Sequence, residues 1–116
     1  MAYEGSCHCG TVAFAVEGDP PTSAMSCNCS HCRRKGFLLT FVPAEQFRLL
    51  RGEDRLTDYR FYKHAITHRF CSECGIQPYA EGKMPDGSPT RAVNLRCVET
   101  VDLDSLDVQR VDGASF

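Results

Sequence analysis

The sequence predicts a mainly β fold: one compact domain of short antiparallel strands, with zinc-binding loops at the strand ends. Three observations predict it. The length of 116 residues is near the usual size of a single domain, so we expect residues 1–116 to form one domain. Apolar residues alternate at period two in several short runs, which Gly, Pro and Asp punctuate. Seven of the eight cysteines fall into three close groups, a spacing typical of metal ligands.

The first half of the chain contains four expected elements. Residues 11–17 alternate between apolar and other residues, which predicts a strand. Residues 37–42 form a short apolar run that predicts a buried strand, halted by Pro43. Residues 44–50 fit either a helical turn or a strand, and residues 55–62 alternate loosely. The side chains expected to share a face within these strands are Val12, Phe14 and Val16, and then Tyr59 and Phe61.

The second half of the chain predicts two further strands and one turn of helix. Residues 66–70 alternate and lead directly into a cysteine pair, and residues 92–98 alternate again. Residues 102–108 could hold one helical turn, capped by Asp102 or Asp104. The side chains expected to share a face are Ile66, His68 and Phe70, and then Val93, Leu95 and Cys97.

Charge and hydropathy exclude several classes of function. A formal net charge of −2 and the absence of Trp argue against general binding of nucleic acids, which usually requires a strongly basic surface. The longest apolar stretch, residues 37–42, is far too short to cross a bilayer, so we expect no membrane association. The first residues carry neither a basic region nor an apolar run. We therefore expect a cytoplasmic protein with reduced cysteines.

Two cysteine pairs predict one closed metal site. Cys71 and Cys74 are separated by two residues and followed by Gly75, which allows the backbone to turn back. Cys7 and Cys9 have a less usual spacing but are also followed by a glycine and an expected strand. Thiolates are soft ligands, and four of them in a tetrahedron suit zinc. We expect these four cysteines to hold a structural zinc ion, which contributes about 10 kcal/mol to folding in small domains.

The remaining group consists of Cys27, Cys29 and Cys32, and it is one ligand short of a closed tetrahedron. Catalytic zinc ions have typically three protein ligands and an open fourth position. We favour such an open site. The alternatives are an empty site and a site closed by a fourth protein ligand, either His31 or Cys97. His31 lies inside the ligand loop and is expected to point away from the ion, and Cys97 fits better as a buried apolar thiol.

The polar residues around this triplet have two interpretations each. Arg33 or Arg34 could hold a substrate carboxylate or a developing alkoxide, but a solvated basic turn with Lys35 is the simpler interpretation. His31 could transfer a proton near neutral pH, or it could be an exposed loop residue. The other three histidines carry no metal-spacing signal, and we expect them to be ordinary surface or strand residues: His8, His64 and His68.

The order of the cysteine motifs resembles the glutathione-dependent formaldehyde-activating enzyme family, a centromere protein V-like zinc domain. The resemblance rests on Gly-x-Cys-His-Cys-Gly in residues 5–10, on Cys-x-Cys-x2-Cys-Arg-Arg in residues 27–34, and on Phe-Cys-x2-Cys-Gly in residues 70–75. Residues 93–97 and 101–103 resemble the C-terminal part of the family. The resemblance covers essentially the whole chain.

The resemblance implies a β-rich fold similar to the zinc-containing guanine-nucleotide-release chaperones. It implies two zinc ions, a structural one on the two cysteine pairs and an active-site one on the triplet. It also implies the partners, glutathione and formaldehyde, whose condensation to S-hydroxymethylglutathione is classed as carbon–sulfur lyase chemistry in reverse. The expected function is therefore addition of a thiol, glutathione or similar, to formaldehyde or another small aldehyde, or the reverse. The alternative is a non-catalytic binding module in which both metal sites are structural.

Overall fold

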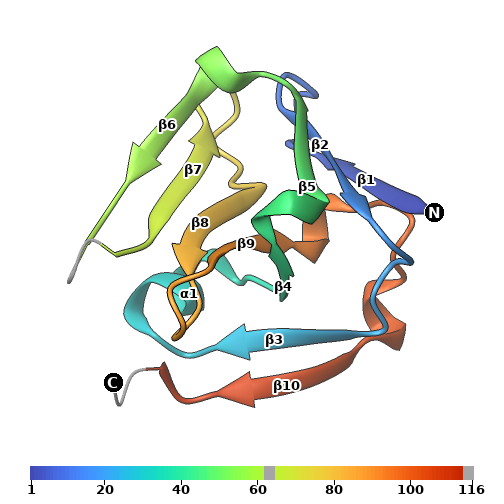
Figure 1. Cartoon of the computed structure of the whole chain (residues 1–116), viewed down its shortest axis with the longest axis vertical. Helices are drawn as coiled ribbons and strands as arrows, with labels where there is room; N and C mark the ends of the chain where they lie inside the picture. The colour runs from blue at the N-terminus through green and yellow to red at the C-terminus, as the bar shows by residue number, and fades with distance from the viewer. Residues whose placement is uncertain (62–64, 114–116) are drawn as a thin grey trace.

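The computed structural model describes residues 1–61 and 65–113, and its path is drawn in Figure 1. Ten strands dominate it, together with one short α-helix and four 3-10 turns. The strands are β1 (Ala2–Ser6), β2 (Ala13–Glu17), β3 (Ser23–Cys27), β4 (Leu39–Pro43), β5 (Phe47–Arg51), β6 (Leu56–Tyr59), β7 (Thr67–Cys71), β8 (Tyr79–Lys83), β9 (Pro89–Asn94) and β10 (Asp107–Val111). The helices are α1 (Ser30–Lys35), η1 (Ala44–Gln46), η2 (Glu53–Arg55), η3 (Leu95–Cys97) and η4 (Leu103–Ser105).

The strands form two sheets, which confirms the predicted mainly β class. The smaller sheet has the order β1-β2-β5, and the larger has the order β10-β3-β4-β9-β8-β7-β6. Neighbouring strands are antiparallel, as expected, except for β10, which pairs with β3 in parallel. Figure 1 shows β3 and β10 side by side below α1, with β6 and β7 on the far side of the helix. The parallel pairing brings the end of the described chain to the loop that follows β3.

The hydrophobic core lies between the two sheets. Phe14 of β2 is fully buried and stacks on Phe47 of β5, with ring centroids 5.3 Å apart. Phe47 in turn contacts Tyr79 of β8 in the larger sheet, at a centroid distance of 4.5 Å. Val93 of β9 is also fully buried in this cluster. Aromatic contacts of this kind add to the burial of apolar area, so the core holds the two sheets in a fixed relation.

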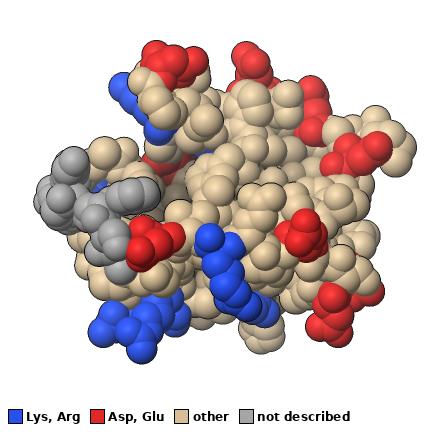
Figure 2. All heavy atoms as spheres, turned by 90° about the horizontal axis from the view of Figure 1, so that it is seen from below, with Lys and Arg blue, Asp and Glu red and all other residues tan. Residues whose placement is uncertain are grey.

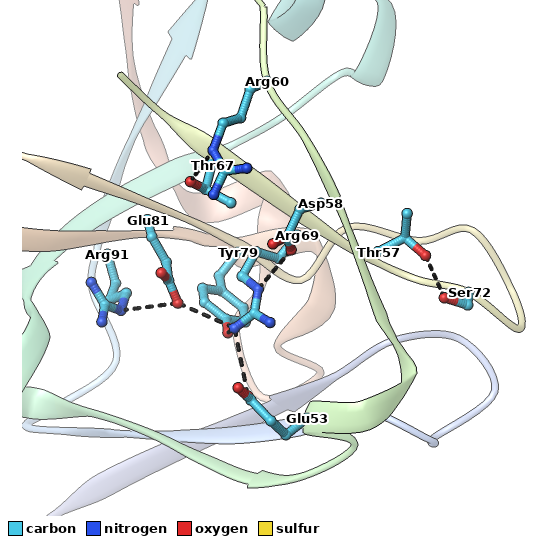
Figure 3. Close-up of polar contacts among 10 residues, drawn as sticks. All are labelled: Glu53, Thr57, Asp58, Arg60, Thr67, Arg69, Ser72, Tyr79, Glu81 and Arg91. Carbon is cyan, nitrogen blue, oxygen red and sulfur yellow. Dashed lines mark hydrogen bonds and ion pairs between the residues drawn. The ribbon is translucent and has the colours of Figure 1, made fainter. Parts of the chain in front are cut away.

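A partly buried ionic network on the same face of the larger sheet joins three strands (Figure 3). The guanidinium of Arg69 on β7 donates to Asp58 on β6 at 2.9 Å and to the hydroxyl of Tyr79 at 3.0 Å. It also contacts Glu81 on β8 and the exposed Glu53 of η2. A guanidinium that is largely removed from water requires several acceptors to offset its lost hydration, and these four groups supply them.

Most of the expected elements have the predicted type, but their first and last residues differ from the prediction. Residues 44–50 combine both alternatives, since η1 is followed directly by β5. The expected strand over residues 92–98 is wrong beyond Asn94, whose side-chain oxygen accepts from the backbone N–H of Arg96 and caps η3. Tyr62, the last residue of the expected strand 55–62, lies outside the described residues. Asp102 caps η4, as one of the two alternatives predicted.

Two further findings concern helices. The sequence interpretation did not foresee α1, which begins immediately after Cys29. Within the described part of the chain, no helix combines the length and the hydropathy that crossing a membrane requires.

Candidate metal centres and the adjoining cavity

Two similar turns bring together the first cysteine cluster, which we call the quartet: Cys7, Cys9, Cys71 and Cys74. In the first turn the backbone N–H of Cys7 donates to Val12 at 3.0 Å, and Gly10 adopts φ 81°. In the second, the N–H of Cys71 donates to Ile76 at 2.9 Å, and Gly75 has the same φ. All four sulfurs lie within 4.8 Å of one another. The quartet could therefore hold a single metal ion.

Backbone and hydroxyl groups around the quartet favour thiolates. The N–H of Val12 points to Cys7 Sγ at 3.3 Å, and that of Glu73 points to Cys71 Sγ at 3.4 Å. The side-chain hydroxyl of Thr11, 3.1 Å from Cys9 Sγ, is the main cause that lowers the pKa of Cys9 to about 6. Burial instead raises the pKa of Cys71 to about 11. Metal binding requires thiolates, and a cation between the four sulfurs is the natural counter-charge for them.

The second cluster, which we call the triplet, consists of Cys27, Cys29 and Cys32. Cys27 is the last residue of β3, Cys29 is the N-cap of α1, and Cys32 lies in the first turn of that helix. The N–H of Cys32 donates to Cys29 Sγ at 3.3 Å, which is the capping contact of α1. The three sulfurs lie within 4.8 Å of one another. Cys29, a candidate metal ligand, thus caps the start of α1, and the first turn of the helix places Cys32 near it. Cys27 reaches the same point from the end of β3.

The acidities of the triplet differ. Burial raises the pKa of Cys29, but hydrogen bonds from Cys32 outweigh it and leave the pKa below that of a free thiol. Burial, followed by a hydrogen bond with the side chain of Cys29 and then by the charge of Cys29, raises the pKa of Cys32 far above that of a free thiol. Three thiolates this close repel one another unless a cation lies between them. The donor set therefore fits a soft cation such as zinc.

No fourth ligand completes the triplet among residues 1–61 and 65–113. Cys97 is buried, and its Sγ lies 4.0 Å from the carbonyl oxygen of Gln77. Burial, followed by the charges of Cys7 and Cys74, raises the pKa of Cys97 to about 12. The charges that act on Cys97 thus come from the quartet and not from the triplet. Cys97 itself belongs to neither cluster. His31 also contributes no atom to the triplet.

The ring of His31 packs into a cluster of aromatic side chains instead. Its centroid lies 4.0 Å from His68 of β7 and 5.2 Å from Phe61. Tyr59 of β6 and the buried Phe37 complete the cluster at 5.7 Å and 5.8 Å. Burial, followed by the charge of Lys35, lowers the pKa of His31. The ring packs α1 against β6 and β7.

His68, which the sequence interpretation took for an ordinary strand residue, is a central member of that cluster. It is 6% exposed, and its Nδ1 accepts a hydrogen bond from the side-chain amide of Gln77 at 3.0 Å. Burial, followed by the charges of His31 and Lys35, lowers its pKa to about 4. The alternation in residues 66–70 indicated only that His68 lies on one face of the sheet. His64 lies outside the described residues.

A cavity of about 390 Å³ opens beside the triplet. It is lined by Ser26, Cys27, Asn28, Cys32, Arg33, Gly36, Arg110, Val111 and Asp112. Three of these residues belong to the C-terminal segment, which no motif in the sequence connected to the site. The carbonyl of Val111 accepts from the backbone N–H of Asn28 at 3.1 Å. A side chain on Gly113 would overlap Cys27 Sγ, so only glycine permits this close approach.

The three basic residues after the triplet have separate positions. Arg33 lines the cavity. Arg34 donates to the carbonyl of Ser30 at 2.8 Å along its own helix, and Lys35 lies over the ring of Phe70, 5.5 Å from its centroid. Of the three, Arg33 is therefore the one placed to meet a ligand.

Comparisons with known proteins agree with this arrangement. A curated protein of Halomonas elongata named "Putative glutathione-dependent formaldehyde-activating enzyme" is 30% identical over an alignment of 82 residues, and the match covers 64% of this chain. The match spans 52% of that relative, about half its length. A crystal structure of a Rhodobacter sphaeroides protein is 30% identical with a TM-score of 0.77, covering 91% of this chain and 99% of the other. The family described as glutathione-dependent formaldehyde-activating enzyme matches residues 2–109, and the chain therefore belongs to that family.

Proposed function

We propose that this chain is a zinc-dependent enzyme of the carbon–sulfur lyase type. It adds a thiol, glutathione or a similar compound, to formaldehyde or another small aldehyde, or carries out the reverse reaction. The observation that carries the proposal is the triplet: three convergent sulfurs, no fourth ligand among the described residues, and a cavity of about 390 Å³ beside them. Membership of the family supports glutathione and formaldehyde as the reactants.

The two clusters take different tasks in this proposal. The quartet has the four ligands of a closed structural site, and its sulfurs join the turn after β1 to the end of β7. Cys7 and Cys71 of the quartet pack with Val12 in a small apolar cluster. The triplet has the three ligands of a catalytic site. Both donor sets suit zinc, so the proposed enzyme holds two zinc ions.

The reaction requires that one bond forms and one proton moves. The thiol loses its proton, its sulfur attacks the carbonyl carbon, and a carbon–sulfur bond forms. The electron pair of the carbonyl moves to the oxygen, which then takes up a proton. A zinc ion held by the triplet supplies Lewis acidity, which stabilises a thiolate or polarises a carbonyl oxygen.

The chain's own residues bind and orient the reactants. Arg33 offers guanidinium donors at the cavity wall to an anionic oxygen. Cys29 fixes the start of α1, so that Cys32 and Arg33 are presented on a single turn. His31 acts less directly, because its ring lies in the aromatic cluster and does not line the cavity. We assign His31 the task of positioning α1.

Substitution of Cys29 tests the assignment, and Cys97→Ala is a matched control, because Cys97 belongs to neither cluster. We expect Cys29→Ser to retain one zinc of two and to lose adduct formation, followed by NMR on glutathione with ¹³C-formaldehyde. Cys97→Ala should retain both ions and the activity. Full activity in Cys29→Ser would sink the catalytic assignment of the triplet. A zinc-loaded protein that gives no adduct above the uncatalysed rate would favour the binding module.

A further inference from the structure

The cavity beside the triplet is formed by two segments that are far apart in the sequence. One is the end of β3 with α1, and the other is the end of β10. In the parallel register Arg110 lies opposite Ser26, the residue before Cys27. Arg33 follows Cys32 directly. An arginine therefore stands next to the triplet on each of the two segments.

Both arginines lack an anionic partner within the described residues. The described ion pairs of arginine involve Arg55, Arg69 and Arg91 instead. Arg33 and Arg110 are exposed and line the same cavity. Figure 2 shows the face that lies at the bottom of Figure 1, where β3 and β10 run, and both basic and acidic side chains stand out there from a mainly uncharged surface.

One acidic group also belongs to the cavity wall. The carboxylate of Asp112 accepts a hydrogen bond from the side-chain amide of Asn28 at 3.0 Å. The cationic side chains of the lining still outnumber the carboxylates, two to one. The volume of about 390 Å³ lies in the range of ligand pockets, about 300–1,000 Å³. The cavity is therefore large enough for more than the reacting thiol group.

We propose that Arg33 and Arg110 together bind a carboxylate of the thiol substrate. The site then selects thiols that carry a carboxylate over neutral thiols of similar size. A guanidinium presents a planar set of donors that matches a carboxylate, and both arginines line the cavity that Cys27 and Cys32 also line. The proposal rests on the proposed function, because it concerns how the thiol is recognised at the same site. Arg110 is the residue that it adds to the proposed function, which uses Arg33 alone.

Binding without chemistry tests the proposal separately from the reaction. Isothermal titration calorimetry measures binding of glutathione, and of its diethyl ester, to the zinc-loaded protein in the absence of aldehyde. We expect Arg33→Gln and Arg110→Gln each to weaken glutathione binding about tenfold or more, the loss of one charge-assisted pair. Arg110→Lys keeps the positive charge but loses the planar pair of donors, so its affinity for glutathione should lie between those of the wild type and Arg110→Gln. Arg48→Gln is the control, because Arg48 is exposed on β5 of the other sheet.

Each outcome decides the question. Weak binding of the diester, together with the losses above and an unchanged Arg48→Gln, supports the carboxylate site. Equal affinity for glutathione and its diester overturns it, as does wild-type affinity in Arg110→Gln at equal zinc content. Absence of glutathione binding to the wild type also overturns it. Carboxylate-dependent binding without any adduct formation would support the recognition site and refute the proposed reaction alone.

Discussion

Acid should destabilise this protein through His68, and replacement by Phe should remove that effect. His68 is 6% exposed, and burial, followed by the charges of His31 and Lys35, lowers its pKa from 6.5 to about 4. The unfolded chain therefore binds a proton at His68 more readily than the folded protein. Proton uptake favours unfolding wherever the unfolded state binds more protons. The stability is fully present above pH 6.5 and is lost as the pH falls towards 4.

The magnitude follows from the two pKa values. With 6.5 in the unfolded chain and about 4 in the folded protein, lowering the pH from 7.5 to 5.5 removes about 1.3 kcal/mol of unfolding free energy. The full shift corresponds to about 3 kcal/mol at a pH below both values. The narrower pH interval is preferable because protonation of the proposed thiolate ligands increases at lower pH.

The assay is urea unfolding, followed by circular dichroism at both pH values, for the wild type and His68→Phe. Phe keeps a ring of similar size in the aromatic cluster, but it leaves the amide of Gln77 without its acceptor. The lost hydrogen bond affects the variant equally at both pH values. Protonation of the proposed metal ligands affects both proteins equally at each pH. Both effects therefore cancel when the two losses are compared. The wild type should lose about 1.3 kcal/mol more than the variant. Equal losses in the two proteins would refute the reasoning.

Four further substitutions probe close contacts and a partly buried charge. Gly113→Ala should weaken zinc binding at the triplet about tenfold, measured by competition with a chromophoric chelator, because the new side chain overlaps Cys27 Sγ; unchanged affinity would contradict this. Gly52→Ala should lower the unfolding free energy by about 2–4 kcal/mol and Gly87→Ala by about 1 kcal/mol. The two glycines have φ near +91° and +89°, but only Gly52 has neighbours within 4 Å, so equal losses in urea unfolding would rule out the close approach as the cause. Arg69→Met should cost about 1–2 kcal/mol in the same assay, because it removes the partly buried guanidinium that these carboxylates share; a loss within experimental error would show that the network contributes little.

Local patterns carried much of the prediction. The Cys-x2-Cys-Gly sequence at residues 71–75 indicates a turn because a glycine can adopt the positive φ that such a turn needs. Alternation at period two identified strands because it reflects which face is buried. The same alternation misjudged residues 95–97, where the side chain of Asn94 offers the backbone a helical turn instead. Local hydrogen bonding by a polar side chain competes with the sheet.

The sequence by itself determined the mainly β class, the family, and the division of the cysteines into two pairs and a triplet. These features depend on neighbours in the chain, which a sequence displays directly. Only the tertiary structure decided that β10 pairs in parallel with β3 and places Arg110 beside the triplet. Only the structure showed His31 against His68 rather than at the sulfurs. Such contacts join segments that are remote in sequence, and their energy comes from packing and burial. The spacing of residues along the chain does not indicate which remote segments will pack together.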